Sequence, residues 1–256
     1  MKSLKNKIYK SELIIKLRNT FGIKKINLNI SNLQKHISIS DAFCWRTDND
    51  YTTTFKFTDI LKLFYKINDS DIELKFYSKN NKFIKKIEFK KIDLFNELLI
   101  DKKFMGGIED YGSFYIFHKN IMNNHKDMII SNRCYLGFSY KNNLKSYVHG
   151  NMLARYLDVQ NNKVKNDIIK TSFVKNQTYK IQNYFSDYDN IELFFANPTS
   201  YKIIFDINKK NYSLNPGNSI IINFKTDKII KITSNSLFMR PTIFNYKNNF
   251  IDVLHG

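Results

Sequence analysis

The chain is a succession of short runs of β-branched and aromatic residues, and this pattern constrains its fold more than any other feature. Most runs are five to seven residues long and are bounded by Asn, Asp, Ser, Lys or Gly. Such residues favour strands, and the polar residues between them favour turns. The clearest runs are TTTFKF (52–57), IELKFY (72–77), FIKKIEF (83–89), GSFYIF (112–117), CYLGFSY (134–140), IELFFA (191–196), KIIFDI (202–207), SIIINF (219–224) and IIKIT (229–233).

Regular alternation of helix and strand is missing from this pattern, so a parallel α/β sheet is not expected. Short strands separated by turns are typical of sandwiches and barrels. The sequence therefore predicts an all-β protein, mostly strands with a few short helices. Two segments, 59–65 and 94–99, fit a helix or a strand equally well.

One helix is expected near the N-terminus, over residues 11–20. Ser11 can cap it, Glu12 suits its first turn, and Gly22 offers a stop. We expect residues 1–24 to form an N-terminal extension that carries this helix.

An internal repeat divides the remainder of the chain. Residues 138–150 read FSYKNNLKSYVHG and residues 244–256 read FNYKNNFIDVLHG, an ungapped match at an offset of 106 residues. His and Gly are scarce in the chain, with five and eight copies, so their match at fixed spacing is informative. The KNN segments suit hairpin tips, because Asn tolerates positive φ.

A weaker match lies upstream in each half, in the same order. TFKF (54–57) resembles TYKI (178–181), and DIELKF (71–76) resembles NIELFF (190–195). The collinear order favours a duplication. We therefore predict two tandem, internally duplicated β-sandwich-like units, over residues 25–150 and 151–256.

The chain is strongly basic, with 41 Lys and Arg against 23 Asp and Glu and a net charge of +18. An A/T-rich coding bias explains much of the Lys and Asn content, but it need not explain the charge excess. Such a charge attracts polyanions. Only five of the basic residues are Arg, which favours non-specific attraction over the bidentate recognition of bases or phosphates.

The two cysteines, Cys44 and Cys134, do not form a disulfide framework or a zinc motif. We expect both to be buried, reduced thiols. No apolar stretch approaches the roughly 20 residues of a transmembrane helix, and the basic N-terminus lacks the features of a signal peptide. The cytoplasm is the expected location.

Candidate catalytic residues are few and weak. His149 and His255 occur in both copies of the repeat and could serve as a general base, or they could hold the hairpins by hydrogen bonds. Glu109 and Asp110 are paired carboxylates beside glycines, a pattern that equally describes a solvated turn.

Candidate ligand-binding residues are aromatic or basic. Trp45 and Arg46 could stack a sugar ring or a base, although the segment also reads as the approach to a hairpin. Tyr140 and Tyr246 are the equivalent tyrosines of the two repeats. Two further histidines, His118 and His125, flank a polar loop without other metal ligands, so neither a metal site nor a cofactor is expected.

No nucleotide-binding, hydrolase, metalloprotease or RNA-binding motif occurs in the chain. The leading hypothesis is a non-catalytic tandem β-sandwich that binds a macromolecule, either a polyanion or a glycan. An enzyme of unfamiliar type, with a site near His149, His255 and Trp45, is the first alternative. A structural subunit of a larger assembly, bound to protein partners through exposed strand edges, is the second. The sequence leaves the oligomeric state open.

Overall fold

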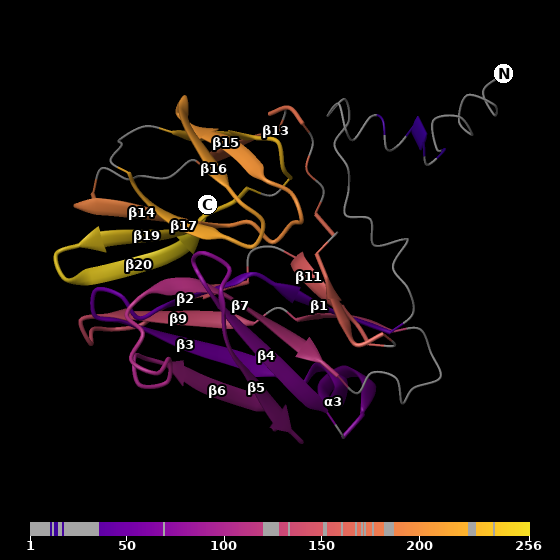
Figure 1. Cartoon of the computed structure of the whole chain (residues 1–256). Coiled ribbons are helices and arrows are strands. Elements are labelled where there is room, and N and C mark those ends of the chain that lie inside the picture. The colour runs from indigo at the N-terminus through magenta and orange to yellow at the C-terminus, as the bar shows by residue number, and fades with distance from the viewer. Residues whose placement is uncertain are drawn as a thin grey trace.

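The protein is nearly all β, as its sequence predicts. Its structure, a computed structural model, is described for the following residues: 11, 13, 14, 17, 36–68, 70–119, 128–132, 134–150, 153–159, 161–166, 168, 169, 171, 173–175, 177–181, 187–224, 229–237 and 239–256. Figure 1 shows the strands gathered into two groups, with the strands of residues 177–255 above those of residues 37–158.

Three four-stranded sheets are built around the first half of the chain. Sheet 1 has the order β12 (Lys163–Lys165), β11 (Leu153–Asp158), β1 (Ile37–Asp41) and β8 (Ile129–Asn132). Sheet 2 has the order β2 (Phe43–Arg46), β7 (Tyr111–His118), β4 (Asp71–Ser78) and β5 (Phe83–Lys90). Sheet 3 has the order β10 (Ser146–His149), β9 (Tyr135–Tyr140), β3 (Tyr51–Thr58) and β6 (Phe95–Ile100).

Two further four-stranded sheets belong to the second half. Sheet 4 has the order β17 (Ser219–Phe224), β14 (Asn190–Ala196), β19 (Thr242–Lys247) and β20 (Phe250–His255). Sheet 5 has the order β13 (Gln177–Ile181), β18 (Ile230–Ser234), β15 (Ile203–Ile207) and β16 (Lys210–Leu214). Strand pairs are antiparallel except for β1 and β8, which run parallel.

Strands β7 of sheet 2 and β14 of sheet 4 are buried on both faces, and this sets the layering. In β7, Phe114 belongs to the core shared with sheet 3, whereas the next residue, Tyr115, packs towards sheet 1. In β14, Leu193 packs against sheet 5, whereas Phe194 joins the core of sheets 2 and 3. Successive strand residues point to opposite faces, so each of these strands serves two cores. The largest core therefore contains side chains from both halves of the chain.

The two repeated segments form equivalent hairpins, β9–β10 and β19–β20. Each first strand pairs with the central strand of its sheet, β3 or β14. The KNN segments lie at the hairpin tips, with positive φ at Asn142 and Asn248. The closing glycines also match, because Gly150 N donates to Cys134 O at 2.9 Å and Gly256 N donates to Pro241 O at 3.0 Å.

The weaker upstream match does not occupy equivalent positions. TFKF lies in β3, the neighbour of β9 in sheet 3, whereas TYKI lies in β13, at the edge of sheet 5. By position, β3 corresponds to β14, since both pair with the repeated hairpin. The duplication therefore stays a prediction that the hairpins favour and the upstream similarity does not.

The predicted division at residue 150 also stays a prediction. Strand β11 begins after it at Leu153 and pairs with β1 of the first half, with Ile39 opposite Tyr156. Strand β12 follows β11 in the same sheet. Sheet 1 therefore joins strands from both sides of that division.

The two segments that fit either a helix or a strand, 59–65 and 94–99, adopt different structures. Residues 60–65 form helix α3 (Ile60–Tyr65), capped by the side chain of Asp59, which accepts from Lys62 N at 2.9 Å. Residues 95–100 form β6. Of the N-terminal helix predicted over 11–20, the described part is Ser11, Leu13, Ile14 and Leu17, and its three apolar residues are helical. The remainder of that helix lies outside the described residues.

Candidate binding face

The predicted ligand-binding residues Trp45 and Arg46 lie in the interior. Trp45 has no exposed surface, and its Nε1 donates to Tyr77 O at 2.9 Å. Arg46 is 1% exposed. Trp45 belongs to the core of sheets 2 and 3, and the Arg46 guanidinium packs over the rings of Tyr51 and Phe244, so neither side chain is presented to solvent.

Arg46 is the centre of a buried polar network between the two halves of the chain. It forms a bidentate pair with Asp48, at 2.8 and 3.0 Å, and its second terminal nitrogen lies 2.5 Å from Glu192 Oε2. Tyr246 donates to the same Glu192 oxygen at 2.5 Å. Although burial opposes the charged guanidinium, the hydrogen bonds to Asp48 hold the pKa of Arg46 above its usual value. The cluster is a paired, hydrogen-bonded interior site.

The tyrosines predicted from the repeat join this network. Tyr140 and Tyr246 pack edge to face, with ring centroids 5.5 Å apart. Tyr51 donates to the Tyr246 hydroxyl at 2.5 Å, and the Arg46 guanidinium lies 3.8 Å from the Tyr51 ring centroid. Burial raises the pKa of the Tyr51 and Tyr246 phenols, so both stay protonated. Three of the four predicted ligand-binding residues are thus brought together. They meet in the interior, between the two halves of the chain, and not on an exposed surface.

His149 and His255 also meet. Their ring centroids are 4.2 Å apart, and His255 Nε2 lies 3.0 Å from His149 Nδ1. The carboxylates Glu109 and Asp110 do not face each other, because Glu109 pairs with Lys102 at 2.8 Å and Asp110 with Lys79 at 2.9 Å. His118 is buried, and His125 lies outside the described residues.

A different surface, the outer face of sheet 3, carries the exposed aromatic residues. Two rows of side chains cross the sheet on this face. The first row runs from Tyr147 over Gly137 and Thr54 to Leu99. The second runs from His149 through Tyr135 and Lys56 to Glu97, with Phe95 opposite Thr58 beyond it. We call the set Lys56, Phe95, Glu97, Leu99, Tyr135 and Tyr147 the aromatic face.

The aromatic side chains of this face are open to solvent. Phe95 is 79% exposed, Tyr135 57% and Tyr147 41%. The Tyr147 ring lies directly over Gly137, where a β-carbon would come within 2.5 Å of Tyr147 Cε1. Glycine at this position lets the ring lie flat against the sheet. Exposed aromatic clusters of this kind mark binding surfaces more often than scattered apolar residues do.

The charges on the aromatic face largely compensate one another. Lys56 lies 3.4 Å from Glu97 and its Nζ is 4.7 Å from the Tyr147 ring centroid. Contacts with Tyr147 and then Glu97 raise the pKa of Lys56, so it stays charged. Lys145, at the start of the returning strand, also approaches Glu97, at 3.7 Å. The face is therefore not a concentrated positive surface.

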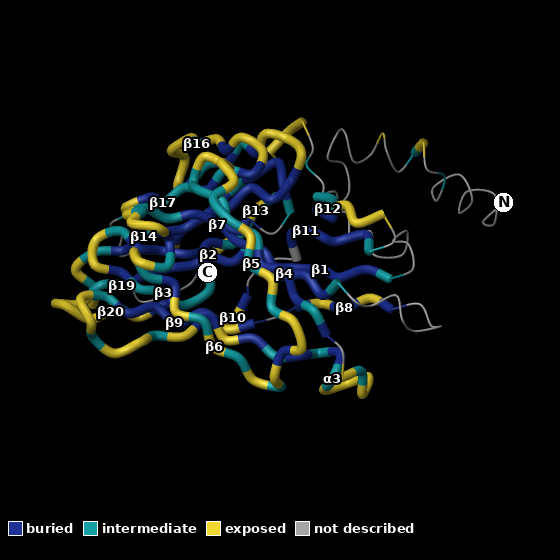
Figure 2. Tube along the Cα trace, turned by 60° about the horizontal axis from the view of Figure 1, so that its bottom comes forward, coloured by how far each residue is buried: buried dark blue, intermediate teal, exposed yellow. Residues whose placement is uncertain are grey.

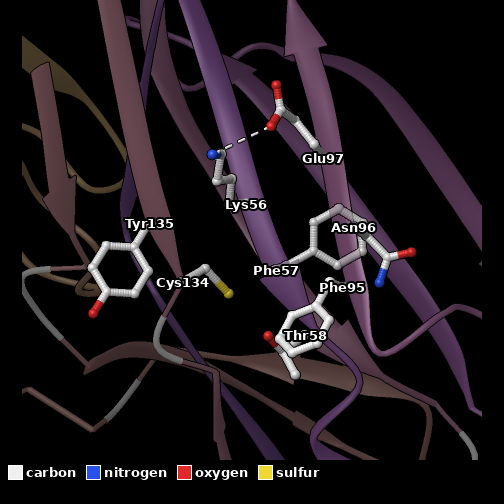
Figure 3. Close-up of a pocket in the computed structure, with 8 residues that line it drawn as sticks. All are labelled: Lys56, Phe57, Thr58, Phe95, Asn96, Glu97, Cys134 and Tyr135. Carbon is white, nitrogen blue, oxygen red and sulfur yellow. Dashed lines mark ion pairs between the residues drawn. The ribbon is translucent and has the colours of Figure 1, made fainter. Parts of the chain in front are cut away.

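A pocket of about 470 Å³ opens beside the aromatic face, at the end of sheet 3 (Figure 3). Its lining consists of Lys56, Phe57, Thr58, Phe95, Asn96, Glu97, Cys134 and Tyr135. Burial raises the pKa of the Cys134 thiol well above its usual value, so this side chain is not a thiolate nucleophile at neutral pH. The pocket offers apolar walls with a few polar groups.

Sequence analysis missed Phe95, Tyr135 and Tyr147. A signal for them existed in the alternation along 95–99 and 135–139, where every second residue points outward. The alternation is not decisive in the sequence, because residues 94–99 fit a helix equally well and no local pattern shows that Trp45 is buried.

Two features of the described residues concern metalloproteins and membrane proteins. No group of three or more His, Cys, Asp or Glu side chains there is placed to hold a metal ion. In the same residues, none of the helices has the length and apolar character needed to cross a membrane.

Comparison with known proteins adds little. No protein family matches the chain, and no curated protein matches it. Among solved structures, it is similar to a cupin 2 conserved barrel domain protein from Leptotrichia buccalis, with 10% sequence identity and a TM-score of 0.20, over 83% of this chain and 90% of that one. At that TM-score the likeness shows neither the fold nor the function of this chain.

Proposed function

We propose that this protein is a non-catalytic binding protein whose ligand is a glycan without strong negative charge, held on the aromatic face of sheet 3. The observation that carries the proposal is the group of three exposed aromatic rings, Phe95, Tyr135 and Tyr147, on one side of one sheet beside a pocket. Aromatic faces bind the apolar faces of rings, and sheet strands hold them in fixed positions.

The local charges favour a neutral ligand over a polyanion. Lys56 and Lys145 both approach Glu97, so their charges are partly compensated before any ligand arrives. A surface that attracts nucleic acid relies instead on uncompensated Lys and Arg. In the pocket, the Glu97 carboxylate and the Asn96 amide oxygen can accept hydrogen bonds from sugar hydroxyls, whereas the Asn96 amide nitrogen already donates to Asp93 O.

A non-catalytic role is supported by the state of the titratable side chains in and near the pocket. Arg46, Glu192 and the buried tyrosines are committed to one another in the interior. The pocket thiol of Cys134 is neutral, and the nearest sequence-predicted base, His149, contacts another histidine rather than a carboxylate. A general acid and base pair is not assembled around the pocket among the described residues.

The test is direct binding of the intact chain to a panel of neutral oligosaccharides, a sulfated glycan and a single-stranded oligonucleotide, at low and at near-physiological salt. We expect a neutral oligosaccharide to bind with an affinity that salt barely changes. Tyr147→Ala and Phe95→Ala should each weaken that binding by about tenfold, the effect of removing an important contact side chain.

Tyr201→Ala is the matched control, because Tyr201 is 68% exposed but lies outside the aromatic face. It should leave binding unchanged. Binding only to the oligonucleotide or the sulfated glycan, weakening steeply with salt, would replace the glycan proposal with polyanion binding. An equal loss of glycan affinity in the Tyr201 and Tyr147 variants would show that binding does not depend on the aromatic face.

A further inference from the structure

Arg155 is a buried cation that no anion neutralises. It lies in β11, opposite Ser40 of β1, and is 7% exposed. Its Nε is buried without a hydrogen-bond partner, and in the part of the chain that the structure describes no carboxylate forms an ion pair with the guanidinium. Arg46, which is also buried, is by contrast paired with Asp48 and Glu192. Buried charges are normally paired, so the isolated charge of Arg155 indicates a role beyond packing.

Two tyrosines hold this guanidinium in place where β11 packs on β7. Arg155 Cζ lies 4.3 Å from the ring centroid of Tyr115 and 5.3 Å from that of Tyr77. The two rings pack edge to face, with centroids 5.8 Å apart. Cation–π contacts stabilise the charge, but they leave the N–H groups in the plane of the guanidinium without acceptors. Arg155 is therefore held in position with its donors unused.

Further hydrogen-bond donors lie around the same position. Ser113 and Tyr115 share one face of β7, and Ser113 Oγ is buried without a hydrogen-bond partner. Burial raises the pKa of the Tyr77 and Tyr115 phenols, although the charge of Arg155 opposes the shift. Both phenols therefore stay protonated at neutral pH and can donate a hydrogen bond.

The group borders the open outer face of sheet 2. Tyr77 is partly exposed, and its ring packs edge to face against Phe83, which is 53% exposed, with centroids 5.8 Å apart. On the same face of β4, Glu73 lies 2.6 Å from Lys75 and is also approached by Lys86, at 3.9 Å. The charge of this carboxylate is therefore compensated before any ligand arrives.

We propose that Arg155 is the centre of a binding site for an oxyanion, the carboxylate or phosphate group of a small ligand, between β11 and the outer face of sheet 2. A guanidinium presents parallel N–H groups that match either kind of oxyanion. The hydroxyls of Tyr77 and Tyr115 supply neutral donors beside it. The bound anion supplies the negative charge that the interior lacks at Arg155.

The thermal unfolding midpoint of the full chain tests the site as inorganic phosphate or acetate is added, with chloride keeping the ionic strength constant. A ligand that binds the folded state raises this midpoint. We expect at least one of the two probes to raise it, and the stronger probe identifies the anionic group as a phosphate or a carboxylate. Arg155→Met keeps an apolar stem and removes the charge. It should weaken the apparent affinity at least about tenfold, because hydrogen bonds to a charged group contribute that much or more.

Lys247→Met is the matched control, because it removes the same charge from an exposed side chain at the tip of the hairpin β19–β20, away from β11 (Figure 1). It should respond to the probes as the wild type does. A wild-type midpoint that neither probe changes, or an equal response in the wild type and Arg155→Met, would overturn the site. A loss of response in Lys247→Met as large as in Arg155→Met would do the same, since it would reduce binding to general attraction by the net charge. Arg155 is not part of the aromatic face, so glycan binding is tested separately and the two proposals fail independently.

Discussion

At the scale of single residues, His118 is the most unusual titratable group. It lies at the end of β7 with its side chain fully buried, and its Nε2 is 4.0 Å from Asp59 Oδ1. That oxygen already accepts from Lys62 N and from Ser70 Oγ, at 2.9 and 2.7 Å. Burial lowers the pKa of His118 to about 4, and Asp59 opposes the shift only in part. The imidazole is therefore neutral in the folded protein down to about pH 4.

This shift predicts a loss of stability in acid. The unfolded chain takes up a proton near pH 6.5, but folded His118 does so only near pH 4. Above pH 6.5 the group contributes no pH dependence. Below it, the free energy of unfolding should fall by about 1.4 kcal/mol per pH unit, to a total of about 3 kcal/mol near pH 4. Urea denaturation at pH 7, 6 and 5 measures the slope.

His118→Asn removes the titration and should flatten that slope, whatever it does to the stability at pH 7. If the wild type and the variant lose stability in parallel as the pH falls, another group is responsible.

At the scale of elements, the closing glycine of the first hairpin is a tightly confined position. A β-carbon on Gly150 would lie 2.0 Å from Asp41 Oδ2 and 2.8 Å from Phe43 Cε1, and both of those side chains are buried. We expect Gly150→Ala to lower the free energy of unfolding by about 1–3 kcal/mol, because the neighbours have little room to move. Chemical denaturation checks this.

Leu144→Ala, at the exposed tip of the same hairpin, should change the free energy of unfolding by less than about 0.5 kcal/mol. A Gly150→Ala protein as stable as this control would mean that the end of β10 is looser than its contacts indicate.

Individual strands and hairpins were also the features that the sequence predicted best. The hairpins could be recognised because a KNN tip and a His-Gly end are local features, set by turn geometry over a dozen residues. The segment 94–99 could not be assigned, because its neighbours in β3 lie about 40 residues earlier and decide its conformation. Likewise, Trp45 and Arg46 read as surface groups until β7 and β14 are placed around them. Burial is a property of contacts distant in sequence, so local patterns could not supply it.

The aromatic face could not be predicted from the sequence for the same reason. Tyr135 and Tyr147 come from one hairpin, but Phe95 reaches them only through the pairing of β6 with β3. Which side of the sheet is open depends on where the two halves meet, and the sequence does not state that.

At the scale of the whole molecule, the two halves share one core. Phe244 of sheet 4 packs on Phe138 of sheet 3, with centroids 4.9 Å apart, and on the Arg46 guanidinium, at 4.8 Å. Figure 2 shows the buried strands continuing through the middle of the molecule, with exposed stretches at its periphery, including α3. The sheets should therefore unfold together.

The only tryptophan makes this testable. Trp45 reports the core of sheets 2 and 3, whereas circular dichroism reports all strands, and we expect the two signals to give one coincident unfolding transition. Arg46→Met leaves Asp48 and Glu192, whose side chains are 17% and 12% exposed, without their cation. It should lower the free energy of unfolding by about 3 kcal/mol, the low end of the range for a fully buried pair. Both signals should shift equally. Separate midpoints would mean that the halves are independent folding units.

The open aromatic face affects how readily the protein aggregates. In the described residues β6 is the last strand of sheet 3, so its outer backbone edge could accept a strand from another molecule. Phe95 and Leu99 on that strand would favour such stacking, and Glu97 between them opposes it by adding charge. The strand that carries Phe95 and Leu99 of the proposed binding surface therefore also carries, in Glu97, a charge that opposes aggregation.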